Sequence, residues 1–102
     1  MDTDWCPAYV LSYALSIFKD LPITIFATNY YPSKIFGDNI EIGIHPNLEG
    51  LKNLSVNSLN SVFDPLIKIY PKTRCCRTHK LIWFTSLDQY LFSRNIKVDS
   101  SL

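Results

Sequence analysis

Residues 23–44 read ITIFATNYYPSKIFGDNIEIGI, and their interpretation decides the fold. Ile23 to Phe26 alternates side chains in the manner of a strand, and Ile40 to Ile44 does so more cleanly, with its isoleucines on one face. A turn signal at Gly37-Asp38 lies between the two segments. We therefore predict two strands joined as a hairpin.

The sequence on either side of this hairpin supplies the other elements. An uncharged run from Trp5 to Phe18 predicts a helix that is buried nearly all round and is too short to span a membrane. Apolar residues after Pro46 follow a helical spacing, and Ser86 is placed to cap a last helix. The further elements that we expect are helices over about 48–63 and 87–95 and a second pair of strands at 67–70 and 80–84.

This order of elements, αββαββα, predicts an α+β fold with a small, four-stranded, mainly antiparallel sheet packed with helices. The two ββα stretches can be aligned, with Ile23 and Ile25 against Ile67 and Ile69. They indicate an internal duplication, although a chain rich in isoleucine and leucine also offers such matches by chance. The expected organisation is a single domain over 1–102 with two pseudo-symmetric halves, about 1–50 and 51–102, and a frayed tail at 96–102.

The composition is that of one compact domain. The chain has 102 residues, of which 47% are hydrophobic and 19% are charged, and its net charge is +1. This length excludes two full-size domains, and the small net charge argues against a binder of nucleic acid or acidic membranes that relies on global attraction. The acidic start at Asp2 and Asp4 differs from the basic start of a secretory signal, so we expect a soluble intracellular protein.

The connection between the first two strands is rich in large apolar side chains. Aromatic residues of this kind anchor protein interfaces. Alternatively, they fold back over the sheet and complete the core. The candidate partner-binding residues are Tyr30, Tyr31, Ile35 and Phe36.

The second connection is basic. Residues 65–87 contain five lysines and arginines and no acidic residue, so the rest of the chain sums to a charge of −4. Such a ribbon would attract a phosphate backbone, but a solvated hairpin edge also needs cations to discourage aggregation. The candidate nucleic-acid-binding residues are Lys72, Arg74, Arg77, His79 and Lys80.

The three cysteines and two histidines do not form a recognisable site. Cys75 and Cys76 are adjacent, which makes them poor chelating partners, and Cys6 and His45 are scattered. We expect the paired cysteines to be small apolar residues, or thiols with a pKa somewhat lowered by neighbouring arginines. His45 is interpreted as a strand-end residue hydrogen-bonded to backbone. The sequence therefore predicts no metal, no cofactor and no catalytic residue.

The chain also resembles one group of proteins. In its length and in the isoleucine, tyrosine and asparagine richness of ATNYYPSKIFGDNIEIGI, it is similar to small orphan proteins of filamentous, lipothrixvirus-type viruses of hyperthermophilic archaea. The resemblance implies a virus-encoded protein in the host cytoplasm, with no activity to assign to any residue.

From these features we predict a non-enzymatic module that binds a protein or an extended peptide at a groove between the two halves. The alternative is a nucleic-acid-binding protein that uses the basic hairpin from Lys68 to Lys80.

Overall fold

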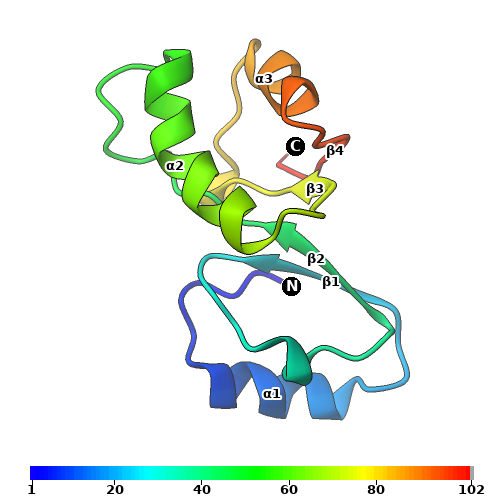
Figure 1. Ribbon diagram of the computed structural model, residues 1–102. Helices are drawn as coiled ribbons and strands as arrows, with labels where there is room; N and C mark the ends of the chain where they lie inside the picture. The colour runs from blue at the N-terminus through cyan, green and yellow to red at the C-terminus, as the bar shows by residue number, and fades with distance from the viewer. Residues whose placement is uncertain (102) are drawn as a thin grey trace.

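The computed structural model describes residues 1–101 and shows an α/β fold built on a four-stranded parallel sheet. The strands lie in the order β1-β2-β3-β4, and each neighbouring pair is parallel (Figure 1). The predicted α+β fold with a mainly antiparallel sheet is therefore wrong. In chain order the elements are α1 (Ala8–Ile17), β1 (Ile23–Ala27), the 3₁₀ turn η1 (Ser33–Ile35), β2 (Ile40–Ile44), α2 (Val56–Ile69), β3 (Cys75–Cys76), the 3₁₀ turn η2 (His79–Leu81), α3 (Leu87–Ser93) and β4 (Val98–Asp99).

The first two strands lie where the alternation predicts them, but they do not form a hairpin. They pair in parallel, from Ile23 opposite Ile40 to Ala27 opposite Ile44. Parallel neighbours require a connection long enough to return along the sheet, and residues 28–39, which include η1, provide it. Alternating side chains are compatible with both directions of pairing, which is why the pattern alone did not distinguish them.

The second predicted pair of strands does not exist. Residues 67–69 are the last turn of α2, where Leu59, Phe63 and Leu66 form one buried face. Residues 80–84 pass from η2 into an irregular segment, and the strand at this point is Cys75–Cys76. The predicted element order αββαββα and the predicted duplication of a ββα unit are therefore wrong.

The end of the chain joins the sheet. Val98 and Asp99 pair with β3, and Ile96 is buried. Of the frayed tail predicted at 96–102, residues 96–101 are instead held by backbone pairing with β3, and residue 102 lies outside the described residues.

Helix α1 is exposed on one side, in contrast to the expectation of a helix buried all round. Leu11 and Leu15 are its buried residues, whereas Tyr9 and Tyr13 are 77% and 71% exposed. A single helix against a sheet buries only the stripe that faces the sheet. None of the helices within residues 1–101 combines the length and hydropathy that a bilayer-spanning segment needs.

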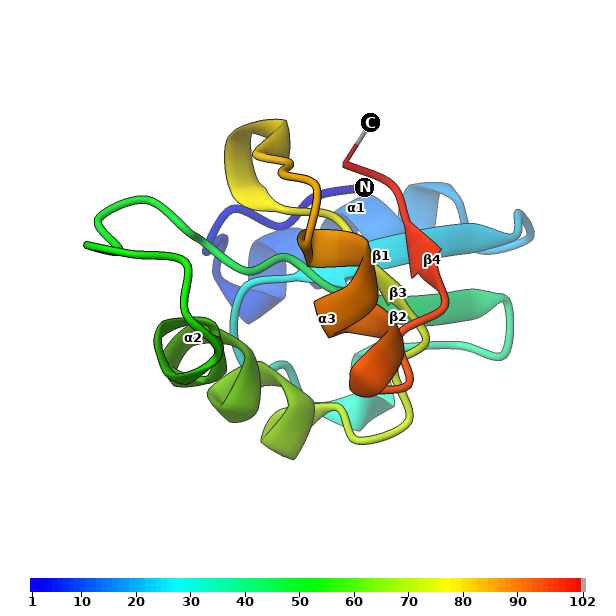
Figure 2. The same cartoon turned by 90° about the horizontal axis from the view of Figure 1, so that it is seen from above.

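All three helices pack against the same face of the sheet. Ile25 and Ala27 contact the α1 side, and Ile44 lies in the core beneath α2 and α3. These residues share a face because Ile25 is opposite Ile42 and side chains two residues apart point the same way. The sheet is curved, so that α1 lies at one end of the molecule and α2 and α3 lie at the other (Figures 1 and 2).

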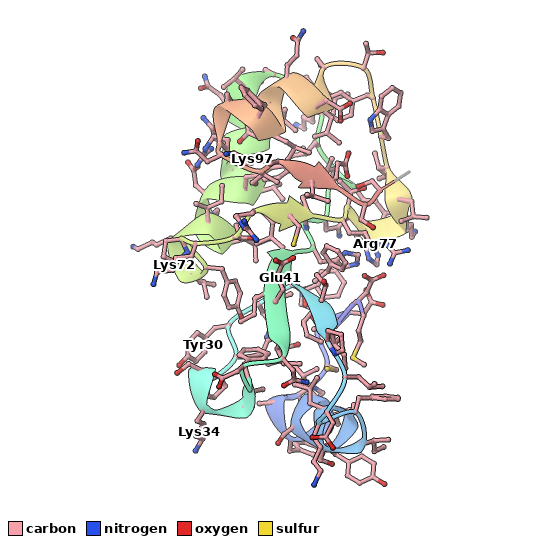
Figure 3. All side chains as sticks on the ribbon, turned by 90° about the vertical axis from the view of Figure 1, so that its right-hand side faces the viewer. Tyr30, Lys34, Glu41, Lys72, Arg77 and Lys97 are labelled. Atoms are coloured by element: carbon pink, nitrogen blue, oxygen red, sulfur yellow. The ribbon has the colours of Figure 1, made fainter. Side chains whose placement is uncertain are left out.

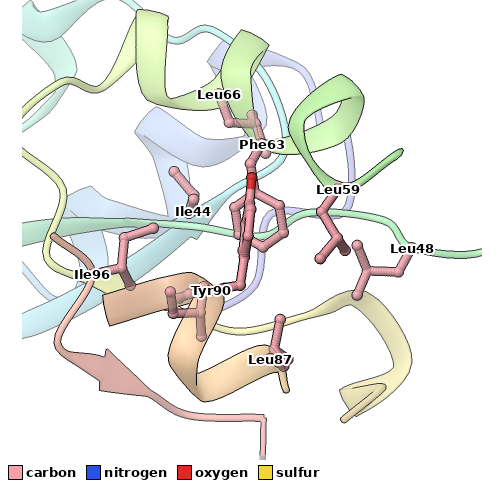
Figure 4. Packing of buried hydrophobic residues seen from close by; sticks show 10 residues of the cluster. Ile44, Leu48, Leu59, Phe63, Leu66, Leu87, Tyr90 and Ile96 are labelled. Atoms are coloured by element: carbon pink, nitrogen blue, oxygen red, sulfur yellow. The ribbon is translucent and has the colours of Figure 1, made fainter. Parts of the chain in front are cut away.

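The larger core cluster lies between α2, α3 and the sheet (Figure 4). Phe63 is fully buried and packs edge-on against Tyr90, with ring centroids 5.0 Å apart. The other residues of the cluster are Ile44, Leu48, Leu59, Leu66, Cys76, Leu87, Leu91 and Ile96.

In the described part of the chain no helix covers the opposite face of the sheet, which is seen in Figure 3, where Glu41 and Arg77 are labelled. Three strands approach closely here, because Gly43 has no side chain. A Cβ at Gly43 would lie 2.6 Å from the Cys75 Sγ and 2.9 Å from the Phe26 Cδ1. Because the middle of this face is closely packed, there is more room for polar groups at the ends of the strands.

Replacing Gly43 with alanine is expected to lower the free energy of unfolding by about 1–3 kcal/mol, because the added methyl group overpacks this contact. Urea unfolding followed by circular dichroism measures the change. The double variant Gly43→Ala, Cys75→Ala should regain part of the loss, but not all, because the Cys75 carbonyl oxygen would still lie 2.8 Å from the new Cβ. A Gly43→Ala protein as stable as the parent would contradict the close approach.

Candidate metal centre

The polar residues of the candidate site gather at the carboxyl ends of the parallel strands. Asp2 forms a parallel bridge to Phe26, which places the first residues beside β1. His45 directly follows β2, and His79 follows β3, with its backbone N–H donating to the Pro46 carbonyl. The carboxyl ends of parallel strands meet at one edge of a sheet, where ligands of open α/β sheets commonly bind.

Asp4, His45 and His79 form a compact cluster at this edge. One Asp4 carboxylate oxygen lies 3.2 Å from the His45 Nε2 and 3.4 Å from the His79 Nδ1. One ligand atom from each residue lies within 4.8 Å of the other two. His45 is 3% exposed and Asp4 is 60% exposed, so the cluster has a buried side and a side open to solvent.

The tautomer of His45 follows from its backbone contact. The His45 Nδ1 lies 2.5 Å from the Arg77 carbonyl oxygen, which can only accept a hydrogen bond. In the neutral ring the proton is therefore on Nδ1, and Nε2 presents a lone pair toward the Asp4 carboxylate. Two acceptors that face each other at 3.2 Å favour a cation between them. A backbone carbonyl that orients the distal nitrogen is typical of metal-binding histidines.

His79 is held by neighbouring groups as well. Its Nε2 lies 3.9 Å from a Glu49 carboxylate oxygen, and its ring lies edge-on to the His45 ring, with centroids 5.5 Å apart. A hydrogen bond from Lys80 lowers the pKa of Glu49, so the carboxylate behind His79 is ionised. The Glu49 carboxylate thus lies near the Nε2 of His79, while the Nδ1 of the same ring lies near Asp4.

These three residues fit a divalent metal ion. Two imidazole nitrogens and one carboxylate oxygen are the donors that catalytic zinc sites use, with a further position left for water or substrate. The exposed side of Asp4 provides that open direction. The donor types, the tautomer of His45 and the two facing acceptors therefore all favour a metal ion at this position.

A second carboxylate lies beside the cluster. The Asp2 Oδ1 is buried and has no hydrogen-bond partner among residues 1–101; it lies 3.7 Å from the Arg77 Nη1 and 4.0 Å from the His45 Nδ1. The Arg77 Nε is also buried and unpartnered, and the guanidinium lies over the Phe26 ring. An incompletely paired carboxylate with one buried oxygen, next to a metal-type cluster, is a candidate for proton transfer.

Asp4 reaches the cluster from a tight turn formed by Thr3 to Cys6. Asp4 and Trp5 have φ values of 43° and 60°, and the Cys6 N–H donates to the Thr3 carbonyl at 2.9 Å. Two consecutive positive φ angles are typical of a type I′ turn, where glycine and asparagine are favoured. Non-glycine residues in such conformations cost of order 1–3 kcal/mol each and occur most often at functional sites.

Three of the predicted partner-binding residues, Tyr30, Tyr31 and Phe36, line one pocket, whereas Ile35 lines a different one. Tyr31 is buried and its hydroxyl donates to the Cys6 carbonyl at 2.8 Å, with Phe36 edge-on beside it. Tyr30 is 64% exposed and points away from the sheet (Figure 3). Ile35 packs at the border of the α1 core cluster. The alternative interpretation, in which the loop completes the core, describes Tyr31, Ile35 and Phe36.

The basic residues are also dispersed. Lys72 and Arg77 lie on opposite sides of the molecule (Figure 3). Arg74 pairs with Glu41 at 3.3 Å, and Lys80 pairs with Glu49 at 2.7 Å. The fifth residue of this predicted set, His79, belongs to the metal-type cluster. These residues therefore do not form a continuous cationic ribbon.

The cysteines are free thiols, and those of β3 are buried. Burial, together with the smaller effect of the nearby Glu41 carboxylate, raises the pKa of Cys75 to about 11. Burial also raises the pKa of Cys76 well above its usual value. The predicted lowering of these pKa values is therefore wrong, because burial outweighs the attraction of Arg74.

Sequence reasoning missed the cluster because it assigned the wrong strand directions. In antiparallel hairpins the residues that follow successive strands lie at opposite edges, so Asp4, His45 and His79 had no reason to meet. A parallel interpretation would have brought together His45 and His79, which follow β2 and β3, whereas Asp4 precedes α1 and no strand pattern marks it. The backbone hydrogen bond expected for His45 is confirmed.

Comparison with solved structures supports this architecture. The chain is similar to a protein of Bordetella bronchiseptica described as a candidate polysaccharide deacetylase involved in O-antigen biosynthesis, with a TM-score of 0.83 and 24% sequence identity. The match covers 96% of this chain and 43% of that one, so the chain spans less than half the length of this relative. At this identity the likeness shows the fold. No curated protein matches the chain.

A family model gives the assignment. The model described as "WbmS-like: Polysaccharide deacetylase" matches residues 1–102. It overturns the resemblance to proteins of filamentous archaeal viruses, because the whole chain matches a different family. It also overturns the prediction of a non-enzymatic protein- or peptide-binding module, together with its nucleic-acid-binding alternative. The chain belongs to the WbmS-like polysaccharide deacetylase family.

Proposed function

We propose that this chain contributes the metal-binding part of a hydrolase site that removes acetyl groups from a polysaccharide. The observation that carries the proposal is the Asp4, His45 and His79 cluster at the carboxyl edge of a parallel sheet. The family description names the same class of reaction. The solved relative described as acting in O-antigen biosynthesis supports a bacterial surface polysaccharide as the substrate class.

The reaction sets clear requirements. Water adds to the acetyl carbonyl carbon, the bond from that carbon to the sugar nitrogen or oxygen breaks, and acetate leaves with a free amine or hydroxyl on the sugar. The site must activate the water, stabilise the negative charge on the carbonyl oxygen and move one proton from the water to the leaving atom. A divalent ion such as Zn²⁺, held by Asp4, His45 and His79, supplies Lewis acidity for the first two tasks.

The residues of the chain divide the remaining tasks. His45 is preorganised by its hydrogen bond to the Arg77 carbonyl, and His79 lies between Asp4 and the Glu49 carboxylate. Asp2 is the candidate base, because its unpartnered Oδ1 lies beside the cluster without being part of it. Arg77 keeps this carboxylate in place through the 3.7 Å ion pair.

Acetate release measures the proposed activity. The zinc-loaded protein is expected to release acetate from an N-acetylated hexosamine oligomer. Asp4→Asn should lose both zinc binding and acetate release, by on the order of 100-fold or more, because a ligand is removed. Asp2→Asn should bind zinc normally and lose acetate release alone.

Asp88→Asn is the matched control, because this exposed carboxylate accepts from the Trp83 indole and lies outside the cluster. It should leave both measurements unchanged. Equal acetate release by the parent protein and Asp4→Asn would contradict the proposal.

A further inference from the structure

We propose that Trp5 is a stacking platform for a pyranose ring and seats an acetylated sugar against the Asp4, His45 and His79 cluster. The inference rests on the proposed function and names the part of the substrate that this residue would recognise. The proposed role of Trp5 is to bind the saccharide, whereas the proposed role of the metal-type cluster is in the reaction.

Trp5 lies at the rim of the cluster and is open to solvent. It follows Asp4 directly, and its ring lies edge-on to the His79 ring, with centroids 5.2 Å apart. It is nevertheless 51% exposed, so much of the indole is available to a ligand. A large, solvent-exposed aromatic ring beside a polar site is well placed to bind a partly apolar ligand.

The backbone holds Trp5 in a conformation that its side chain does not favour. Its φ of 60° lies at the second central position of the turn, where glycine is the usual residue. The Trp5 N–H donates to the Thr28 hydroxyl at 2.8 Å, and Thr28 in turn is bonded to the side chain of Thr3. These hydrogen bonds fix the backbone at Trp5.

Core packing does not explain a tryptophan here. Trp5 lies outside both core clusters, and its side chain is exposed. A strained position that carries an exposed aromatic ring, one residue from a metal-type ligand, indicates a role for the ring itself.

The ligand chemistry follows from the ring. A pyranose presents a face of C–H groups, which packs on the electron-rich face of an indole while its hydroxyl groups point to water. A sugar ring stacked on Trp5 would place its substituents next to His79 and the open side of Asp4. The stacking surface thus suits a pyranose ring, and the proposed function adds the N- or O-acetyl group, so the ligand class is an acetylated hexopyranose within a saccharide chain.

Trp5→Gly is the informative variant, because glycine tolerates the positive φ and removes only the ring. Its thermal unfolding midpoint should not fall, and its affinity for Zn²⁺ should stay within about twofold of the parent, because Asp4 keeps its backbone position. Its affinity for triacetylchitotriose, measured by NMR titration, should fall at least about tenfold. In acetate release, KM should rise while kcat changes little.

Two further variants complete the experiment. Trp5→Asn, which also tolerates a positive φ, should reproduce the loss of saccharide binding. Trp83→Ala is the matched tryptophan control, since Trp83 is 42% exposed but its indole N–H donates to Asp88. It should keep the parent affinity for the saccharide.

The outcomes separate this inference from the proposed function. Unchanged saccharide affinity in both Trp5 variants would overturn the platform, as would a parent protein that binds Zn²⁺ but no saccharide. Loss of stability and of Zn²⁺ binding in Trp5→Gly and Trp5→Asn would show a structural role and would also overturn it. Trp5-dependent saccharide binding without Zn²⁺ binding would support the platform while refuting the metal centre.

Discussion

Replacing His45 with alanine is expected to abolish high-affinity zinc binding, with a loss of more than about 100-fold. Removal of a group that only orients a metal ligand already lowers metal affinity by about 10–100-fold, and His45 is proposed to be a ligand itself. The substitution also leaves the Arg77 carbonyl without its partner in a buried position. Isothermal titration with Zn²⁺ measures the affinity, and circular dichroism shows whether the variant is folded.

Glu41→Gln provides the comparison for His45→Ala. Glu41 lies on the same helix-free side of the sheet but contacts Arg74 and the Cys75 thiol. Its zinc affinity should equal that of the parent. If His45→Ala folds and still binds Zn²⁺ as tightly as the parent, His45 is not a ligand.

Replacing Phe63 with alanine is expected to lower the free energy of unfolding by about 3–5 kcal/mol. The ring is 0% exposed and packs against Tyr90 in the larger core cluster, so its removal leaves a cavity between α2 and α3. Small domains have total stabilities of about 5–15 kcal/mol, and the variant would therefore be close to unfolding. Urea denaturation at 25 °C measures the difference.

Phe92→Ala is the matched control for this prediction. Phe92 lies on α3, close in sequence to Tyr90, but is 72% exposed. Its loss should change the free energy of unfolding by no more than about 0.5 kcal/mol. Similar effects of the two substitutions would contradict the described core.

The sequence predicted the local elements better than their arrangement. The strands at Ile23–Ala27 and Ile40–Ile44 and the helix that begins at Leu87 lie where their patterns indicate. Residues 67–69 were assigned to a strand because Ile67 and Ile69 alternate with polar neighbours, yet they continue the helical face of Phe63. Short apolar runs fit both periods, and only packing against α3 and the sheet decides between them.

The candidate site could be predicted only in part. The backbone contact of His45 was expected, whereas the meeting of Asp4, His45 and His79 depends on three segments that are far apart in sequence. Their convergence follows from the parallel direction of the strands. That direction is set by crossovers such as residues 28–39, whose path the local pattern does not encode.

The family assignment and the site geometry point to the same chemistry from different observations. The family match covers the whole chain, while the solved relative is more than twice as long as the matched region. The metal-type cluster is nevertheless assembled entirely from residues 4–79. The metal-binding step can therefore be tested on this chain directly, apart from the activity of a longer protein.

X-ray absorption spectroscopy of the protein with one equivalent of Zn²⁺ tests the central claim most directly. The Asp4, His45 and His79 centre predicts a first shell of nitrogen and oxygen at about 2.0–2.2 Å with the scattering pattern of two imidazoles. This spectrum should disappear in Asp4→Asn. Sulfur scattering at about 2.3 Å would instead place the metal on the cysteines and would contradict the account.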